Sequence, residues 1–195
     1  MKCKIIGLTG TFASGKSTVI QIIRKTKGDK VAHYSTSDFV REETARRGLA
    51  QERENWHKVA NEMRATKGAG VLGEIALQRA AALHASVEIV LVDSIRNPAE
   101  IAALRKAGGN NFEMWAIDAP IEQRYQRIKS RARGNEHILS FEEFKASEEK
   151  EMRGNATGQN IAECMRQADI TINNGGANEE LGKKVKALLE KTLAR

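Results

Sequence analysis

Residues 10–17 read GTFASGKS and directly follow the apolar run KIIGL at residues 4–8. The spacing G-x-x-x-x-G-K-[ST] is that of a phosphate-binding loop, and the elements that such a loop requires are present: a buried strand before it and a helix over residues 16–24 after it. Glycines let backbone N–H groups turn inward around phosphate oxygens, and the helix N-terminus adds partial positive charge. The stretch therefore predicts a site for a nucleoside triphosphate.

The side chains of this loop have distinct expected roles. Lys16 would reach the β- and γ-phosphates as a catalytic residue, and the Ser17 hydroxyl would bind Mg²⁺. ATP and Mg²⁺ are thus the predicted cofactors. A chance glycine-rich turn is the alternative, and the flanking strand and helix argue against it. The predicted ATP-binding residues are Gly10, Thr11, Ala13, Ser14, Gly15, Lys16, Ser17 and Thr18.

The bulk properties are those of a single domain spanning residues 1–195. Hydrophobic residues make up 41% of the chain and charged residues 29%, which is ordinary for a globular protein. No apolar run approaches the ~20 residues of a membrane span, and no secretory signal opens the sequence. Cys3 and Cys164 lack metal-ligand or redox-motif spacing. These features predict a cytoplasmic protein with no membrane partner.

The net charge of +7 bears on the class of partner. Basic residues are spread along the chain, and aromatic residues are only 5% of it, which argues against a stacking platform for single-stranded nucleic acid. An enzyme that holds two polyanionic substrates also needs surplus arginine and lysine. We therefore expect a small-molecule nucleotide acceptor as the partner, no nucleic acid, and a monomer or homodimer.

Apolar runs alternate with helical patterns along the chain. Strands that alternate with helices imply right-handed crossovers and a parallel sheet covered on both faces. The predicted fold class is therefore α/β, a three-layer P-loop sandwich with a five-stranded parallel sheet. The predicted strands are residues 4–8, 31–34, 88–92, 112–117 and 170–172.

The last helix has the clearest helical periodicity. Asn178 is expected to cap its start. Its apolar stripe, which should face the sheet, consists of Leu181, Val185, Leu188 and Leu189.

Two segments are longer than a crossover needs. Residues 38–72 are strongly helical without an intervening strand, which predicts a small helical subdomain over the site. Residues 131–145 contain the loop-like stretch RGNEH, after which Ser140 opens a helix with Glu143 in capping-box position. We expect the first segment to be an acceptor-binding cover and the second to be a short lid.

A second strand end carries a carboxylate. EIVLVD at residues 88–93 is typical of a buried strand that ends in an acid, here Asp93, as a Walker B element does. Asp93 would hold Mg²⁺ through a water, beside Ser17. Capping of the turn or of the helix near Pro98 is its alternative role.

Four segments resemble those of P-loop nucleoside monophosphate kinases. DSIR at 93–96 resembles their Asp-Gly-x-Pro-Arg stretch, and STSDFVR at 35–41 resembles their Thr-Gly-Asp-x-x-Arg segment after the second strand. RIKSR at 127–131 is similar to the Arg-x-x-x-Arg at the lid entrance, and DITINNG at 169–175 is similar to the last strand and the loop beside the purine. The resemblance covers nearly the whole chain and is closest to the group that includes dephospho-CoA kinase and archaeal kinase-like proteins related to adenylate kinase.

For the acceptor side, the resemblance implies that Arg41 and Arg96 hold the acceptor phosphate and that Arg96 also takes part in catalysis. Guanidinium forks suit this role because they bind phosphate bidentately and stay charged. Pairing with a nearby acid is the alternative for Arg41. The chain departs from the family pattern at Ser37 and Ser94, where glycine is common, and no proline precedes Arg96.

For the donor side, the resemblance implies that Arg127 and Arg131 act in catalysis, one flanking the nucleotide base and the other reaching the phosphates. Their spacing of four places both on one helix face. A solvated face that pairs with Glu122 is the alternative. Asn174 and Gly175 would contact the base of ATP through the backbone.

These features predict an ATP- and Mg²⁺-dependent phosphotransferase that passes the γ-phosphoryl group to a (deoxy)nucleotide monophosphate. The dephospho-CoA kinase alternative transfers it to a ribose hydroxyl, for which a carboxylate must take the proton. Asp38 stands where that catalytic, substrate-binding carboxylate would be. A third interpretation is a P-loop ATPase switch associated with nucleic acid.

Overall fold

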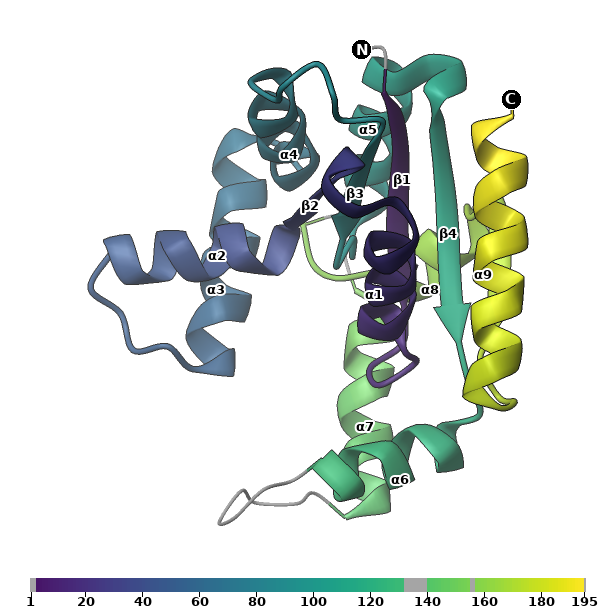
Figure 1. The fold of residues 1–195 in the computed structure, drawn as a ribbon. Coiled ribbons are helices and arrows are strands. Elements are labelled where there is room, and N and C mark those ends of the chain that lie inside the picture. The colour runs from purple at the N-terminus through teal and green to yellow at the C-terminus, as the bar shows by residue number, and fades with distance from the viewer. Residues whose placement is uncertain (1–2, 132–139, 155–156, 195) are drawn as a thin grey trace.

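A parallel sheet forms the centre of the computed structural model, which describes residues 3–131, 140–154 and 157–194, with the backbone alone at Arg131. The strand order is β2-β3-β1-β4-β5, and the pairings between neighbours are parallel (Figure 1). This confirms the predicted five-stranded parallel sheet. The strands are β1 (Lys4–Gly10), β2 (Val31–Ser35), β3 (Ile89–Asp93), β4 (Phe112–Asp118) and β5 (Ile170–Asn173).

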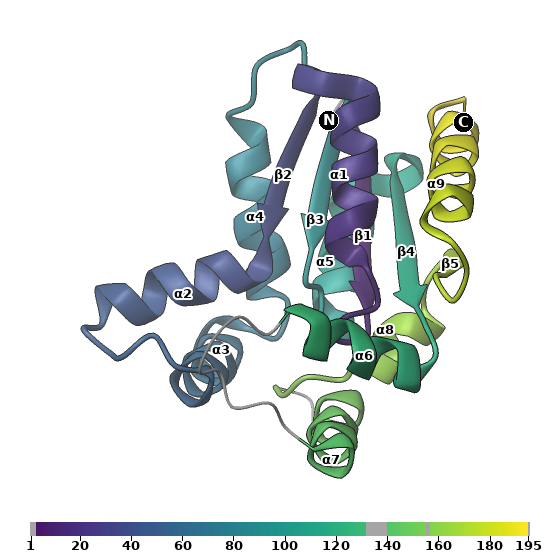
Figure 2. The same cartoon turned by 60° about the horizontal axis from the view of Figure 1, so that its bottom comes forward.

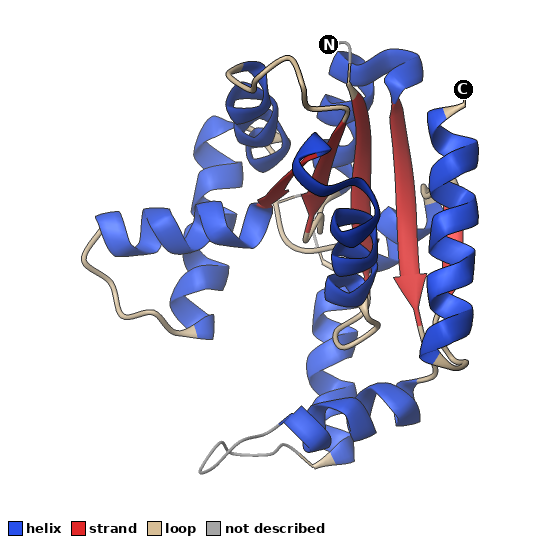
Figure 3. Ribbon diagram, in the orientation of Figure 1, coloured by secondary structure: helices blue, strands red, loops and turns tan. Residues whose placement is uncertain are grey.

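Helices cover both faces of this sheet, as Figure 3 shows. One face is covered by α1 (Lys16–Lys27) and α9 (Asn178–Leu193). The other face is covered by α4 (Val71–Ala81), α5 (Pro98–Gly108) and α8 (Ile161–Arg166). Short 3₁₀ turns at Gly28–Lys30 and Gly109–Asn111 lead into β2 and β4. The molecule therefore has the three layers expected of an α/β sandwich.

Side-chain alternation along β1 divides the core between the two faces. Ile5 packs with the helices α4 and α5, whereas Ile6 and Leu8 pack with α1 and α9. A strand buried on both faces must be apolar at successive positions, which explains the continuous apolar run before the loop. The order of strands places β1 between β3 and β4, so the chain leaves β1 at the point where ligands bind in open parallel sheets.

The start of α9 differs from the sequence prediction. The helix begins at Asn178, and Ala177 is the capping residue, with extended backbone angles and no side-chain cap. Asn178 therefore does not cap the helix. Glu179 and Glu180 lie in the first turn, where their charge favours the helix dipole.

The predicted helical segment after β2 is built from α2 (Thr36–Arg46) and α3 (Arg53–Lys67), followed by α4. α2 leaves the end of β2 directly and projects away from the sheet, and α3 returns beside it (Figure 1). The second predicted segment, residues 131–145, runs from the end of α6 (Ile121–Arg131) into the start of α7 (Phe141–Met152). Residues 132–139, where most of the predicted lid lies, are outside the described residues.

The capping box at the start of α7 is confirmed. The Glu143 amide donates to Ser140 Oγ at 3.2 Å, and the Ser140 amide donates to Glu143 Oε2 at 2.7 Å. Figure 2 shows α6 lying across the carboxyl end of the sheet, with α3 and α7 at the same end. No helix in the described ranges is long and apolar enough to cross a membrane.

A buried ion pair attaches α3 to the body of the protein. Arg64 donates from Nε at 3.0 Å and from Nη2 at 2.8 Å to Glu100 Oε1, on α5. The other carboxylate oxygen of Glu100 accepts from the backbone amides of Arg96 and Asn97 at 3.0 and 3.3 Å. The side chains of Arg64 and Glu100 are 2% and 0% exposed. Glu100 thus links the helical segment to the loop after β3.

Replacing Glu100 should destabilise the protein strongly. In Glu100→Ala, Arg64 becomes a buried charge without its partner and two backbone amides lose their acceptor, so we expect a loss of about 3–5 kcal/mol in the free energy of unfolding. Urea unfolding measures it. Glu163→Gln, which breaks the exposed pair with Arg166 within α8, is the matched control and should change stability much less. Equal effects of the two variants would contradict the assigned role of Glu100.

Candidate active site

The phosphate-binding loop joins β1 to α1 and has a backbone that only glycine allows at two points. Gly10 and Gly15 have φ of 137° and 104°, in the region that side chains rarely adopt. A Cβ at Gly10 would overlap the carbonyl oxygen of Ile117, and one at Gly15 would overlap the side-chain amide of Asn174. The two glycines of the motif are therefore required by the packing behind the loop.

Lys16 lies half-buried at the mouth of this loop. Its ammonium donates to the carbonyl oxygens of Gly10 and Thr11, at 2.7 and 2.8 Å. Burial first, and then the Arg96 guanidinium, lower the pKa of Lys16 to about 8, against the opposing effect of Asp93 and Glu151. The hydrogen-bond partners of the Lys16 ammonium are thus neutral carbonyl groups, and this arrangement favours binding of an anion.

A cavity of about 300 Å³ opens in front of the loop. It collects residues from five places in the chain: the loop, the β2–α2 region, the end of β3 with the loop after it, α7 and the start of α8. The predicted site residues that line it are Gly10, Ala13, Ser14, Gly15, Lys16, Ser17, Arg41, Asp93 and Arg96. Thr11, Thr18, Asp38, Arg127, Asn174 and Gly175 do not line it.

Asp93 lies at the end of β3, at the edge of this cavity. Its Oδ1 contacts Nε2 of His33, on β2, at 3.0 Å, and its Oδ2 accepts from Ser94 Oγ at 3.2 Å. The carboxylate of Asp93 and the hydroxyl of Ser17 line the same cavity, and hard oxygen ligands of this kind suit Mg²⁺. The residues present therefore fit the predicted metal. The contact of His33 with this carboxylate is a feature that the sequence did not predict.

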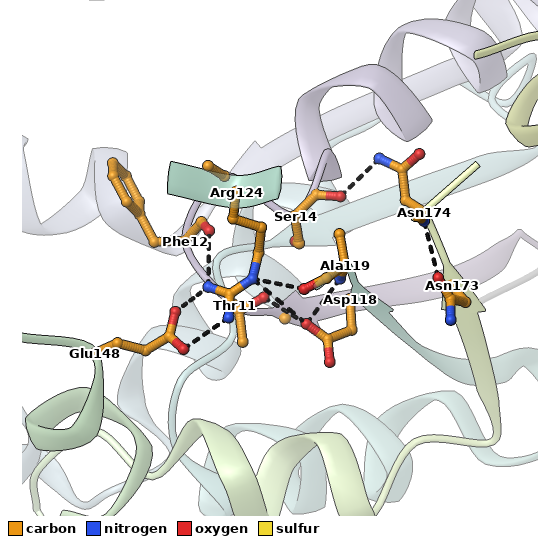
Figure 4. A network of polar contacts seen from close by, with 12 residues as sticks. Thr11, Phe12, Ser14, Asp118, Ala119, Arg124, Glu148, Asn173 and Asn174 are labelled. Atoms are coloured by element: carbon orange, nitrogen blue, oxygen red, sulfur yellow. Dashed lines mark hydrogen bonds and ion pairs between the residues drawn. The ribbon is translucent and has the colours of Figure 1, made fainter. Parts of the chain in front are cut away.

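Arg124, which the sequence did not predict as a site residue, ties the loop to its surroundings (Figure 4). Its guanidinium donates to the carbonyl oxygens of Ala119 and Phe12 at 2.7 and 3.3 Å, and pairs with Glu148 of α7. Beside it, Thr11 donates from Oγ1 to Asp118 Oδ1 at 2.7 Å. Thr11 thus anchors the loop to the end of β4.

The loop after β5 lies directly against the phosphate-binding loop. Asn174 donates from Nδ2 to the Ser14 carbonyl at 2.8 Å, and Arg127 donates from Nη2 to the Asn174 carbonyl at 2.7 Å. Arg127 therefore contacts the loop after β5. The alternative expected from the sequence was an ion pair between Arg127 and Glu122. Gly175 follows Asn174 and accepts from the Gln123 side chain at 3.1 Å. The functional roles of Arg127, Asn174 and Gly175 stay predictions, and the side chain of Arg131 is not described.

A second cavity, of about 260 Å³, adjoins the first and is roofed by α2 and α3. The two share five lining residues. These shared residues are Phe12, Ser37, Arg41, Arg96 and Glu151. The second cavity is walled by apolar side chains as well as by arginines, and the apolar residues are Phe12, Val40, Trp56, Ala60 and Leu72.

The two arginines predicted for the acceptor line both cavities. Arg41 pairs with Asp38 at 2.8 Å, and its guanidinium lies 4.8 Å from the centre of the Trp56 ring. Arg96 donates to Gln159 Oε1 at 2.9 Å and lies 3.5 Å from Glu151 Oε2. Burial lowers the pKa of Arg96, while Glu151 raises it. The loop after β3 thus holds Arg96 between the phosphate-binding loop and the helices α2 and α3.

Asp38 does not point into either cavity. Its side chain is 59% exposed, it pairs with Arg41, and it is not among the described residues that line the cavities. The carboxylates that do line them are Asp93 and Glu151. The position of Asp38 therefore gives no support to a general base there.

Three further polar residues of the second cavity were not predicted: Arg53, His57 and Arg64, all on α3. They are spaced i, i+4 and i+11, which places them on one helix face, with Ala60 between. This spacing can be recognised in the sequence and could have indicated a face that lines a site, but charged residues at helical spacing more often face solvent. Glu151 and Gln159, near or beyond the end of α7, carried no comparable signal.

Known proteins are similar to this chain in sequence or in fold. The family model described as an AAA domain, AAA_17, matches residues 9–145. A UPF0200/UPF0201 protein of Archaeoglobus fulgidus is 35% identical over 98% of this chain, which spans 56% of that protein's length. A UPF0200 protein of Thermococcus kodakarensis is 30% identical, with 98% of this chain and 99% of that protein covered.

Solved structures have the same fold at low identity. TT1252 from Thermus thermophilus is 20% identical, with 98% of both chains covered and a TM-score of 0.62. The APS kinase CysC of Mycobacterium tuberculosis, solved with AMPPNP and APS, is 16% identical, with 97% of this chain and 98% of that chain covered and a TM-score of 0.53. The chain therefore belongs to the AAA_17 family and to the UPF0200 proteins, and it has the fold of P-loop kinases.

Proposed function

We propose that this protein is an ATP- and Mg²⁺-dependent kinase that transfers the γ-phosphoryl group to the phosphate of a (deoxy)nucleotide monophosphate. One observation carries the proposal: the cavity at the phosphate-binding loop and the arginine-lined cavity under α2 and α3 adjoin, and Arg41 and Arg96 line both. Phosphoryl transfer needs a donor and an acceptor aligned across positive charge, because the protein has little covalent chemistry to perform. Adjoining cavities with shared arginines meet that need.

The donor would occupy the cavity at the loop. Backbone N–H groups and the N-terminus of α1 would hold its phosphates, and Lys16 would exchange its two carbonyl partners for phosphate oxygens. A triphosphate would also stabilise the charged form of Lys16 and so raise its pKa, which burial has lowered to about 8. Arg127, which already lies against the loop, would stand beside the donor.

Ser17 and Asp93 are the residues that would hold Mg²⁺ in this cavity. When bound, Mg²⁺ neutralises charge on the donor phosphates. The Asp93 carboxylate is kept in place by His33 and Ser94, so its orientation does not depend on the ligand.

The acceptor would occupy the second cavity, with its phosphate towards Arg41 and Arg96 and its base among the apolar side chains. A phosphate oxygen is already a nucleophile, so this reaction needs no general base. The exposed position of Asp38 accordingly supports a phosphate acceptor over a ribose hydroxyl. The APS kinase of the same fold was solved with both AMPPNP and APS, which supports a two-substrate site on this fold.

Two alternatives remain and are distinguished by the same assays. A dephospho-CoA kinase-like enzyme would phosphorylate dephospho-CoA and depend on Asp38. A P-loop ATPase switch would hydrolyse ATP without an acceptor and respond to nucleic acid. Arginines from α2, α3 and the loop after β3 gather beside the phosphate-binding loop, where the phosphate of a nucleoside monophosphate would lie next to the donor.

Substitution of Gly15 should weaken triphosphate binding. In Gly15→Ala, the positive φ is strained and the new Cβ displaces the Asn174 amide, so we expect affinity for ATP to fall by roughly tenfold to a hundredfold. Isothermal titration calorimetry measures it. Gly28→Ala is the control, because Gly28 also has a positive φ but a Cβ at that position would meet no heavy atom within 4 Å. An affinity for ATP in Gly15→Ala equal to that of Gly28→Ala would contradict the assignment.

A panel of acceptors tests the reaction itself. With Mg²⁺-ATP, we expect turnover on at least one nucleoside monophosphate, a loss of about 10²- to 10³-fold in kcat/KM for Arg96→Ala, and a change within about fivefold for Asp38→Asn. A coupled ADP-release assay, with product identified by mass spectrometry, measures each. The panel includes dephospho-CoA, and separate assays contain single-stranded RNA or DNA.

Different results would favour the alternatives. Turnover on dephospho-CoA that Asp38→Asn abolishes would establish the hydroxyl acceptor. ATP hydrolysis stimulated by nucleic acid, with no transfer to any acceptor, would establish the switch. Either result would refute the proposed reaction.

A further inference from the structure

The carboxylate of Glu151 lies where the two cavities meet. Glu151, in the last turn of α7, is 7% exposed and lines both of them. It pairs with Arg53 of α3, and it lies 3.5 Å from Arg96 Nη1 and 3.7 Å from His57 Nε2. Cationic or polar side chains from α3 and from the loop after β3 therefore contact the same carboxylate, that of Glu151 on α7.

The contacts of Glu151 with Arg96 are looser than those of the other buried carboxylate in this region. Glu100 accepts two bonds from Arg64 at 2.8 and 3.0 Å, whereas Arg96 lies at the limit of hydrogen-bond distance from Glu151 and makes its shorter bond, at 2.9 Å, to Gln159. Glu100 is thus a permanent structural partner. With Arg96, Glu151 therefore lacks the close pair of bonds that Glu100 accepts from Arg64, and its closer partner is Arg53.

The charge balance of the second cavity depends on Glu151. Arg41, Arg53, Arg64 and Arg96 line this cavity. Arg64 is committed to Glu100, and Arg41 is paired with Asp38, which leaves Glu151 as the carboxylate that faces both Arg53 and Arg96. The side chain of Arg96 is only 30% exposed, and a partly buried guanidinium is stabilised by a nearby anion, which Glu151 supplies in the absence of ligand.

A second atom also points to a ligand. Nη1 of Arg64 is buried and has no hydrogen-bond partner within the part of the chain that the structure describes. Leaving a buried donor unsatisfied is unfavourable, and Arg64 lines the same cavity as Arg53 and Arg96. An oxygen atom of a bound molecule would supply the missing acceptor.

We propose that Glu151 holds the place of the acceptor's phosphate, and that a phosphomonoester displaces its carboxylate from Arg53 and Arg96. The inference rests on the proposed function for the identity of the acceptor class, although the anion site itself does not. A phosphate dianion brings more charge and more acceptor atoms than the carboxylate, so it can replace it, whereas an uncharged molecule cannot. Glu151 therefore determines specificity, because binding requires a ligand that competes with an internal anion.

The test measures binding in the full chain, without ATP, by isothermal titration calorimetry. Inorganic phosphate, AMP and adenosine are the probes. Because close charge pairs couple strongly, Glu151→Gln should bind phosphate and AMP about tenfold more tightly or better than the unmodified protein, with adenosine unchanged. Arg53→Ala should weaken the binding of phosphate and AMP.

Glu149→Gln is the matched control. It lies on the exposed face of α7, makes the same change in net charge and leaves the anion site intact, so phosphate affinity should not change. Glu151→Ser is a second variant that removes the carboxylate, and thermal unfolding reports whether each variant is folded. If Glu151→Gln does not fold, the serine variant carries the same expectation.

Three results would overturn the inference. Unchanged or weaker phosphate binding in the folded Glu151 variants would make Glu151 a positioning residue for the arginines. An equal gain in Glu149→Gln would reduce the effect to net charge, and an equal gain for adenosine would reduce it to cavity volume. Tighter phosphate binding without turnover on any nucleoside monophosphate would uphold the anion site and refute only the proposed reaction.

Discussion

Contact between the phosphate-binding loop and two fixed polar groups behind it constrains the rest of the site. The carbonyl of Ile117 fills the space behind Gly10, and the amide of Asn174 fills the space behind Gly15. Because these groups come from β4 and from the loop after β5, the loop keeps its shape only while the strand order holds. The sheet itself thus positions the backbone amides that would bind phosphate. The residues of α2 and α3, which would contact the acceptor, do not supply either of these groups.

Buried charge sets the second constraint. Three of the arginines that lie near the phosphate-binding loop or the cavity beside it are Arg64, Arg96 and Arg124. Carboxylates on α5 and α7 balance the positive charge of these arginines. A buried charge that loses its partner costs far more than an exposed one, so Glu100 and Glu148 are needed to keep the arginines in place. Arg124 also contacts the loop through the Phe12 carbonyl, which couples α7 to the loop through Glu148.

The sequence was sufficient for most local patterns, although Asn178 does not cap α9 as expected. The loop motif, the five strands and the Ser140 capping box depend on residues close together in the chain, and the structure confirms them. It failed where a partner lies far away: Arg64 and Glu100 are 36 residues apart, and Arg96 and Glu151 are 55 apart. The resemblance of residues 35–41 to the kinase segment suggested Asp38 as a general base. In the structure Asp38 lies near the start of α2, where its side chain is exposed and pairs with Arg41.

The chemistry of the two carboxylates in the cavities bears on which acceptor the site suits. A general base for a hydroxyl must reach that hydroxyl and accept its proton. Glu151 pairs with Arg53 and contacts Arg96, and Asp93 contacts His33 beside the predicted metal position, so both carboxylates in the cavities already have partners. A phosphate acceptor avoids this difficulty, since its own oxygen is already charged and the arginines would hold the nucleophile.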